Sequence, residues 1–561
     1  MNNFKNELKK PKYWLLIIAG LIILYYIVYP LFQIFLRSFY IEGEFTLEHY
    51  REVFTNRSNY TALLNSLFVS IFATIFATLL GSIIAFIVVR TNIPYKNILR
   101  FLFMVPFAIP PLFAAMGWVQ LLGPVGYISR MYQVIFDTRS IPWDIYSSYG
   151  IIFVLTVTMY PFVFLIVSGS LQKMDSSLEE VARVSGSSNF QIMRHITLPL
   201  VKTAILAGAV LAFISSIDNF GIPAVLGLRV RYYVLTTRIY EALNIPDMPL
   251  ATSMSVILVL IAIGAVTLLR KLEGAREQYA VVAGKSVRPS IIKLGWAKPL
   301  VMLFIFFILI FFVLLPVGSL FLTSFINYWG APLNFDNLTF ENFQRIFLME
   351  GSSRGIRNSV FLAFVAATIL IFVSSTISLL NIKEKIKGAS LLDTLGMVPY
   401  ALPGSVIGVS AILAWSNPPI GPGLYGTIWI FLAAYIMRYM AFGIRSTRST
   451  LQQIDDSLEE VAQISGASRL RSFKDVTLPL LKPGMISGWI LIFMPAVREV
   501  TVSVLIWSSG AETIGVMTFL YQDSGYPQRA AAMASIVIPI ILVLYLVSQR
   551  LETGSKNEVR G

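Results

Sequence analysis

Residues 175–202 read DSSLEEVARVSGSSNFQIMRHITLPLVK, and residues 455–482 read DDSLEEVAQISGASRLRSFKDVTLPLLK. The two stretches align without a gap at an offset of 280 and match at 15 of 28 positions. Both are polar segments in a chain that otherwise consists largely of apolar runs. The repeat indicates two copies of one structural unit.

The composition is too apolar for a soluble protein of 561 residues: 56% of the residues are hydrophobic, 13% are charged, and the mean hydropathy is +0.72. A helix needs about 20 apolar residues to cross the hydrocarbon core of a membrane. The sequence therefore predicts an all-α integral membrane protein with about twelve transmembrane helices in two six-helix repeats. The expected spans lie near residues 14–36, 63–89, 99–122, 150–170, 203–222, 251–269, 299–322, 359–380, 391–415, 425–444, 484–507 and 531–549.

The duplication extends beyond the polar segments, because MVPFAIP at 104–110 resembles MVPYALP at 397–403 at an offset of 293. Six spans per copy is an even number, so an axis along the membrane normal relates the copies. We expect a first half at 1–275, a basic cytoplasmic linker at 276–298 and a second half at 299–561. The linker contains AGKS, but a phosphate-binding loop needs Gly where residue 279 is Tyr.

The net charge of +14 follows membrane topology. With both termini in the cytoplasm, the cytoplasmic segments hold 30 of the 44 Lys and Arg residues and the opposite loops hold 12. This bias is the positive-inside pattern, and it predicts contact with lipid headgroups and no nucleic-acid partner. The chain has no Cys and only two His, His49 and His195, so we expect no metal centre. It also lacks a catalytic triad or nucleotide loop, which predicts that the chain itself is not an enzyme.

Each polar segment is expected to begin with a short amphipathic helix, at 176–185 and 456–465. Ser176 or Asp456 would cap it, with Glu179 or Glu459 at its third position completing a capping box. A left-handed glycine would end each helix, and a second short helix would run to about His195 or Asp475. In both copies a proline then suits the first turn of the next transmembrane helix.

These segments carry a family resemblance. Glu180-Val181-Ala182, Gly186 and Ile196-Thr197-Leu198-Pro199 are similar to the cytoplasmic signature of permease subunits of binding-protein-dependent ABC importers. Glu460-Val461-Ala462, Gly466 and Val476-Thr477-Leu478-Pro479 repeat it. Both copies have Val in the middle of the family's Glu-Ala-Ala pattern, and Val476 replaces Ile.

The resemblance implies the type I ABC importer permease fold, in which each signature forms a coupling helix that docks in a groove of a separate ATPase. Two ATPase copies would bind this chain, and ATP and Mg²⁺ would bind to them, so no cofactor is expected on the chain itself. The expected coupling residues are Glu180, Val181, Ala182, Gly186, Leu198, Pro199, Glu460, Val461, Ala462, Gly466, Leu478 and Pro479.

Charged residues inside the predicted spans mark either function or pairing, because a charge is costly to place in a membrane. Asp218 and Asn219 align with Arg498 and Glu499 at the 280 offset, and Arg438 lies in another span. These five side chains could line a substrate pathway between the halves. They could equally form an intramembrane salt bridge that only joins helices. Both interpretations remain open at the level of sequence.

The segment DNFGIPAVLG at 218–227 makes ferric-iron permeases the most similar branch of the importer family. The resemblance implies alternating-access import of ferric iron, delivered by an extracytoplasmic binding protein, across the bacterial inner membrane. Thiamine, phosphonate or another organophosphate is the alternative cargo within the class. An ion-coupled secondary transporter is the alternative of another class, and it would tend to carry an acidic site deep in a span.

Overall fold

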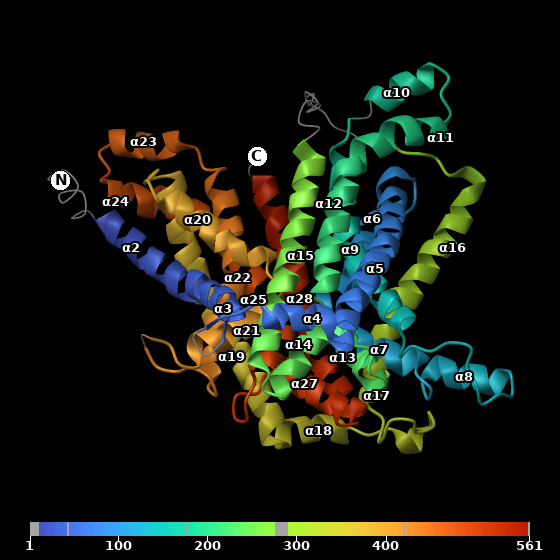
Figure 1. Ribbon diagram of the computed structural model, residues 1–561. Helices are drawn as coiled ribbons and strands as arrows, with labels where there is room; N and C mark the ends of the chain where they lie inside the picture. The colour runs from blue at the N-terminus through green and yellow to red at the C-terminus, as the bar shows by residue number, and fades with distance from the viewer. Residues whose placement is uncertain (1–10, 42–43, 176, 275–289, 420, 559–561) are drawn as a thin grey trace.

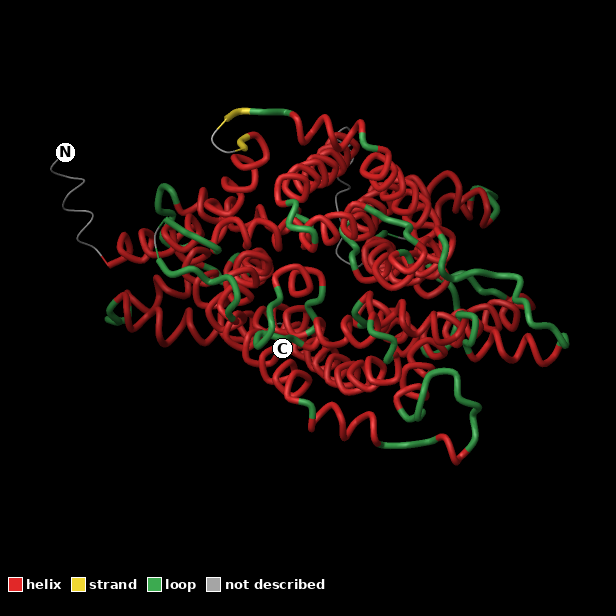
Figure 2. The backbone as a smooth tube through the Cα atoms, turned by 60° about the horizontal axis from the view of Figure 1, so that its bottom comes forward, coloured by secondary structure: helices red, strands yellow, loops and turns green. Residues whose placement is uncertain are grey.

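The computed structural model describes residues 11–41, 44–175, 177–274, 290–419 and 421–558. Ser176 and most of the predicted linker, including AGKS, lie outside the described residues. Helices make up most of the described chain, as Figure 2 shows. One short antiparallel pair, β1 (Tyr40–Ile41) and β2 (Glu44–Phe45), lies at the periphery. The predicted all-α class is confirmed.

The described part of the first half contains seventeen helical elements between Pro11 and Gly274. They are α2 (Pro11–Ile23), η1 (Leu24–Val28), α3 (Tyr29–Phe39), α4 (Glu48–Thr55), α5 (Arg57–Arg90), α6 (Lys96–Ala108), α7 (Pro111–Leu122), α8 (Tyr127–Ile135), α9 (Ser148–Lys173), α10 (Ser177–Val184), α11 (Asn189–Ile192), η2 (Met193–Thr197), α12 (Leu198–Ile217), α13 (Gly221–Leu226), η3 (Leu228–Val230), α14 (Leu235–Asn244) and α15 (Met248–Gly274).

The elements of the second half follow a similar order, but the described residues between 416 and 427 form no counterpart of α8. They are η5 (Gly295–Ala297), α16 (Lys298–Leu309), η6 (Ile310–Leu314), α17 (Leu315–Ser324), η7 (Phe335–Asn337), α18 (Glu341–Leu348), α19 (Glu350–Ile382), α20 (Ala389–Met397), η8 (Val398–Ala401), α21 (Gly404–Trp415), α22 (Ile428–Leu451), α23 (Asp456–Ile464), α24 (Arg469–Ser472), η9 (Phe473–Thr477), α25 (Leu478–Val497), α26 (Thr501–Ile506), α27 (Ile514–Asp523) and α28 (Pro527–Glu558).

Within the described residues, eleven helices are long and apolar enough to cross a membrane, or twelve if one bent pair counts as a single span. That pair consists of α20–η8 and α21, and the helix axis bends by 116° between them. The predicted span 99–122 is likewise divided between α6 and α7. Ile109 and Leu402 are extended at the two breaks, because the residue before a proline avoids the helical region.

Two predicted spans, 203–222 and 484–507, extend too far. Helix α12 ends at Ile217 and α25 ends at Val497, and the chain then enters the short buried helices α13 and α26. The apolar composition continues through both breaks, so hydropathy alone does not reveal them. The charged and polar residues predicted inside these spans therefore lie at helix ends.

The first transmembrane segment of each half packs against the opposite half. Helix α3 contacts α21, and α17 contacts α7. The buried ring of Trp415 lies 5.9 Å from that of Tyr26, and the buried ring of Trp118 lies 5.7 Å from that of Phe311. Each half thus packs its first membrane segment against the other half, although the two halves follow one another in the sequence. We call this arrangement the exchange of first segments.

Each of the four π-helical segments in the described chain ends two residues before a proline. The segments are η1, η2, η6 and η9, and the prolines are Pro30, Pro199, Pro316 and Pro479. A proline cannot donate a helical hydrogen bond, and its ring collides with the carbonyl one turn earlier. The wider turn accommodates the proline without ending the helix.

Candidate functional site

The two repeated segments form matching loops at one end of the molecule. The first loop, residues 175–199, contains α10 and α11, and the second loop, residues 455–479, contains α23 and α24. Both loops lie at the same end as the start of α2 and the end of α28 (Figure 1). The predicted pair of short helices is present in each copy. The second short helix does not stop, because it continues through η2 or η9 into α12 or α25.

Gly186 and Gly466 end the first helix of each loop in the left-handed conformation, with φ of +86° and +93°. Ser187 N–H donates to Ala182 O at 2.9 Å, and Ala467 N–H donates to Ala462 O at 3.0 Å. This bond closes a helix end of the Schellman type. A Cβ atom built on either glycine would meet nothing within 4 Å, so backbone conformation alone favours glycine here.

The helices α10 and α23 present apolar side chains away from the rest of the chain. In α10, Leu178, Val181 and Val184 are 48%, 65% and 91% exposed. In α23, Leu458, Val461 and Ile464 are 46%, 61% and 86% exposed. Glu180 and Glu460 are exposed beside them, while Ala182 and Ala462 are partly buried. Two equivalent amphipathic surfaces therefore project from one end of the protein.

The predicted cap of the second loop, Asp456, needs correction, while Ser176, the cap predicted for the first loop, lies outside the described residues. Asp455, not Asp456, caps α23, since its side chain accepts from Ser457 N–H at 2.9 Å. Asp175 accepts from Ser177 N–H at 3.0 Å in the first loop. The neighbouring acid Asp456 is instead paired with Lys383 across 2.6 Å.

The predicted capping-box role of Glu459 is also wrong, whereas Ser176, the partner predicted for Glu179, lies outside the described residues. Glu179 accepts from Thr197 Oγ1 at 2.7 Å, and Glu459 accepts from Thr477 Oγ1 in the same way. Each glutamate thus ties its short helix to the base of the following membrane helix. The capping box occurs one helix later, at Ser188 of the first loop, whose N–H donates to Gln191 Oε1 at 2.8 Å.

Leu198 and Pro199, like Leu478 and Pro479, occupy the first turn of the long segments α12 and α25. The leucines and prolines are exposed, whereas Thr197 and Thr477 before them are buried. The Thr-Leu-Pro triplet therefore places one buried hydroxyl against the loop glutamate and leaves the next two side chains at the surface.

The intramembrane charges form a network at the junction of the halves. Arg438 Nε lies 3.1 Å from Glu499 Oε2, and Arg438 Nη2 lies 3.8 Å from Asp218 Oδ2. Tyr439 OH donates to the same Glu499 oxygen. A Cβ atom on residue 404 would lie 1.7 Å from Arg438 Nη1, so Gly404 leaves the room that the guanidinium occupies. The structure brings Asp218, Arg438 and Glu499 together.

Asn219 and Glu499 occupy equivalent positions and make equivalent bonds. Asn219 Oδ1 accepts from Ile222 N–H, and Glu499 Oε1 accepts from Val502 N–H, both at 3.0 Å. Each side chain satisfies a free backbone donor in the first turn of α13 or α26. This bond explains the presence of a polar Asn219 side chain in an apolar segment.

Asp218 and Arg498 each reach the broken third span of the opposite half. Asp218 Oδ1 accepts from Gly404 N–H at 2.6 Å, at the start of α21. Arg498 Nη1 donates to Phe107 O at 2.8 Å and also to Ala108 O, at the end of α6. A carboxylate thus lies at a helix N-terminus and a guanidinium at a helix C-terminus, the arrangement that suits the helix dipole. Arg498 is bonded to backbone carbonyls and does not join the Arg438 cluster.

A family model described as "Binding-protein-dependent transport system inner membrane component" matches residues 54–273 and 378–556. The chain belongs to this family. It is a permease of the ABC importer class with the type I permease fold, and the two matched regions include the two loops.

Named relatives agree with the class. The permease is 28% identical over 498 residues to a Haemophilus influenzae permease protein named for ferric transport, covering 88% of this chain and 77% of the relative. It is 27% identical over 537 residues to the ferric transport system permease protein of Actinobacillus pleuropneumoniae, covering 94% and 76%. A Salmonella paratyphi A permease protein named for 2-aminoethylphosphonate transport is 27% identical over 248 residues, covering 44% of this chain and 91% of the relative.

Sequence reasoning missed several residues that hold the permease loops in place. Arg90 pairs with Glu179, Lys383 pairs with Asp456, and Thr197 and Thr477 bind the loop glutamates. A signal was available: Arg90 and Lys383 are equivalent at the 293 offset, and Thr-Leu-Pro occurs in both loops. Within the described residues, no group of three His, Cys, Asp or Glu side chains could hold a metal ion.

Proposed function

We propose that this permease is the membrane subunit of an ATP-driven importer in which two copies of a separate ATPase bind the first and second loops. The observation that supports it is the pair of exposed apolar helix faces at one end of the protein. Val184 and Ile464, at 91% and 86% exposure, are equivalent residues of the two faces. A groove on each ATPase would bury these faces, with Glu180 and Glu460 contacting polar groups at its edge. ATP and Mg²⁺ would then bind to the ATPase.

The loop end would lie in the cytoplasm, and the opposite end would receive an extracytoplasmic binding protein at the bacterial inner membrane. The excess of Lys and Arg in the segments at the loop end supports this orientation. The start of α2 and the end of α28 lie at that end too (Figure 1), in keeping with cytoplasmic termini.

Ferric iron is the proposed cargo, moved inward by alternating access between the halves. Relatives named for ferric transport match 88% and 94% of the chain, whereas the relative named for phosphonate transport matches 44%. The match covers 91% of the phosphonate relative, which is about half as long as this chain, so the layout shared with the relatives named for ferric transport is what supports iron as the cargo. Thiamine is the other cargo of the same class that the test includes.

The test uses the permease purified with its copurifying ATPase and reconstituted in proteoliposomes. ATP hydrolysis and uptake are measured with the cognate binding protein loaded with Fe(III), 2-aminoethylphosphonate or thiamine. Stimulation by the Fe(III)-loaded protein supports the proposal. Stimulation only by an organic cargo contradicts the choice of iron. Uptake that needs an ion gradient and no ATPase contradicts the whole proposal and identifies a secondary transporter.

A further inference from the structure

The two loops are attached to the membrane helices by different interactions. In the first loop the attachment is buried: the side chains of Arg90, at the end of α5, and Glu179, in α10, form an ion pair and are 1% and 2% exposed. Thr197 at the base of α12 donates to the other oxygen of Glu179 at 2.7 Å. One carboxylate thus joins α5, α10 and α12.

The segment that leads into the second half completes this attachment. Ser290 Oγ donates to Glu179 and accepts from Arg90 Nη2 at 3.1 Å. Ile292 N–H donates to Arg90 O at 2.7 Å, and Asn92 N–H donates to Ile292 O at 3.2 Å. The backbone from residue 290 onward is therefore held against the end of α5, directly beside the buried ion pair.

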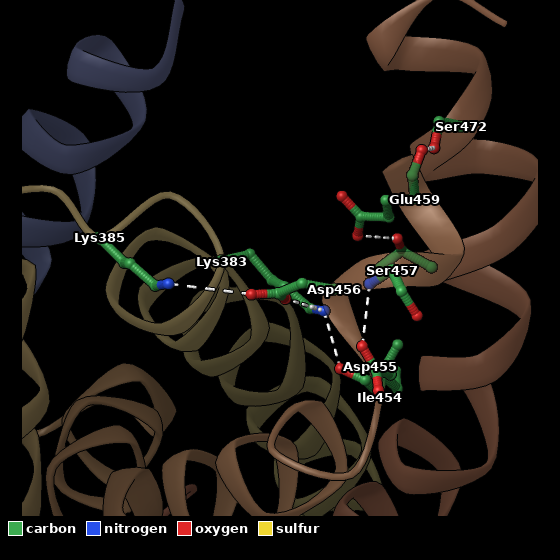
Figure 3. Close-up of polar contacts among 9 residues, drawn as sticks. Lys383, Lys385, Ile454, Asp455, Asp456, Ser457, Glu459 and Ser472 are labelled. Atoms are coloured by element: carbon green, nitrogen blue, oxygen red, sulfur yellow. Dashed lines mark hydrogen bonds and ion pairs between the residues drawn. The ribbon is translucent and has the colours of Figure 1, made fainter. Parts of the chain in front are cut away.

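In the second loop only one partner of the ion pair is buried, since the side chain of Lys383 is 8% exposed and that of Asp456 is largely exposed. Lys383, which is equivalent to Arg90, lies 2.6 Å from Asp456 Oδ1 and donates to Ile454 O at 2.8 Å (Figure 3). Asp456 is 58% exposed, and Lys385 approaches its other oxygen at 3.8 Å. Glu459 keeps its bond to Thr477 but forms no ion pair within the described residues.

The burial of each ion pair determines how the attachment responds to a substitution or to salt. Removing one partner of a buried ion pair leaves an uncompensated charge in a medium of low polarity, which is strongly destabilising. An exposed pair contributes little and is screened by salt. The ion pair of the first loop should therefore change little with ionic strength, whereas the ion pair of the second loop is weakened by salt.

We infer that Arg90, Glu179 and Ser290 are positioning residues that fix the first loop rigidly for the ATPase, whereas the second loop is the compliant one. The part of this inference that concerns the ATPase rests on the proposed function. The two ATPase copies would then be held unequally, although the loop sequences are nearly the same. The coupling of hydrolysis to transport should depend much more on Glu179 than on its equivalent Glu459.

The first experiment measures loop mobility in the full-length permease without any ATPase. The chain contains no Cys, so Val184→Cys and Ile464→Cys give single sites for spin labels at equivalent exposed positions. We expect the label at 184 to be less mobile than the label at 464. Arg90→Met should mobilise the label at 184 and leave the label at 464 unchanged. Equal mobility at both sites, or no effect of Arg90→Met, overturns the inference.

The second experiment measures ATP hydrolysed per solute imported in the reconstituted complex. Glu179→Gln should raise this ratio about tenfold, while the matched control Glu459→Gln should raise it by less than about twofold. The double variant Arg90→Glu with Glu179→Arg exchanges the two charges and should restore much of the coupling. Such a rescue would show that the single variants lose the position of the loop and not the fold of the protein. Equal effects of the two Gln variants contradict the inference. Absence of ATPase binding in the unaltered complex instead contradicts the proposed function and leaves the mobility result intact.

Discussion

Replacement of Arg438 by methionine should destabilise the junction between the halves. Arg438 lies 3.1 Å from Glu499 and 3.8 Å from Asp218, and the side chains of these acids are 6% and 20% exposed. Removing one partner of a buried ion pair costs about 3–5 kcal/mol. Because Arg438 serves two acids, we expect Arg438→Met to lower the free energy of unfolding by an amount in this range.

A double substitution separates the two roles that the sequence left open. Glu499→Gln keeps the oxygen that accepts from Val502 N–H but removes the charge that Arg438 neutralises. Arg438→Met with Glu499→Gln should therefore recover about 2 kcal/mol or more of the loss. Denaturant titration in mixed micelles measures the stability, and proteoliposomes measure uptake.

The outcome for uptake distinguishes pairing from cargo contact. If the network only joins helices, uptake by the double variant should return together with stability. If Arg438 contacts the cargo, the double variant should be stable and inactive. The reasoning from burial is refuted if the single variant loses less than about 1 kcal/mol, or if the double variant is no more stable than the single variant.

Three further predictions concern the loops and the helix breaks. Gly186→Val and Gly466→Val should each destabilise the local backbone by about 1–2 kcal/mol, because both positions have a positive φ. Both variants should still insert into the membrane but should not transport. Unchanged ATPase association and uptake would contradict the coupling role. Arg498→Met should cost about 1–3 kcal/mol by leaving the two carbonyls at the end of α6 unsatisfied, and Arg498→Lys should cost less in the same titration. The hydrogen bond and charge of Lys383 lower the pKa of Asp456 below 3.8, so the stability from this pair is present above that value and is lost only as the pH falls below it. Asp456→Asn should then leave the pH profile of uptake between about 6 and 8 unchanged but reduce its salt dependence, which a series of KCl concentrations at fixed pH measures.

The sequence predicts the local features of the loops well, because these depend on neighbouring residues. Gly186 and Gly466 were expected in the left-handed conformation at the end of a short helix, and both have that conformation. The breaks at Pro110 and Pro403 follow from the geometry of proline and of the residue before it. These features need no knowledge of distant parts of the chain.

Other features depend on tertiary contacts and could not be predicted from one sequence. Two adjacent acids, Asp455 and Asp456, are equally good caps by type, and only the position of Lys383 in space explains why Asp456 pairs with a lysine. Glu179 is suited to a capping box by type, but only contacts made in space bring it a buried arginine from α5 and a threonine from η2. The ends of α12 and α25 are invisible to hydropathy because α13 and α26 are equally apolar.

The exchange of first segments also has a consequence for biosynthesis. Trp118 in the first half packs against Phe311 and Phe312, which the ribosome adds much later, whereas Trp415 meets Tyr25 and Tyr26, which are already in the membrane. The contacts of Trp118 with η6 therefore cannot form until this later segment has been synthesised. The contacts of Trp415 with Tyr25 and Tyr26 can form as soon as α21 is inserted.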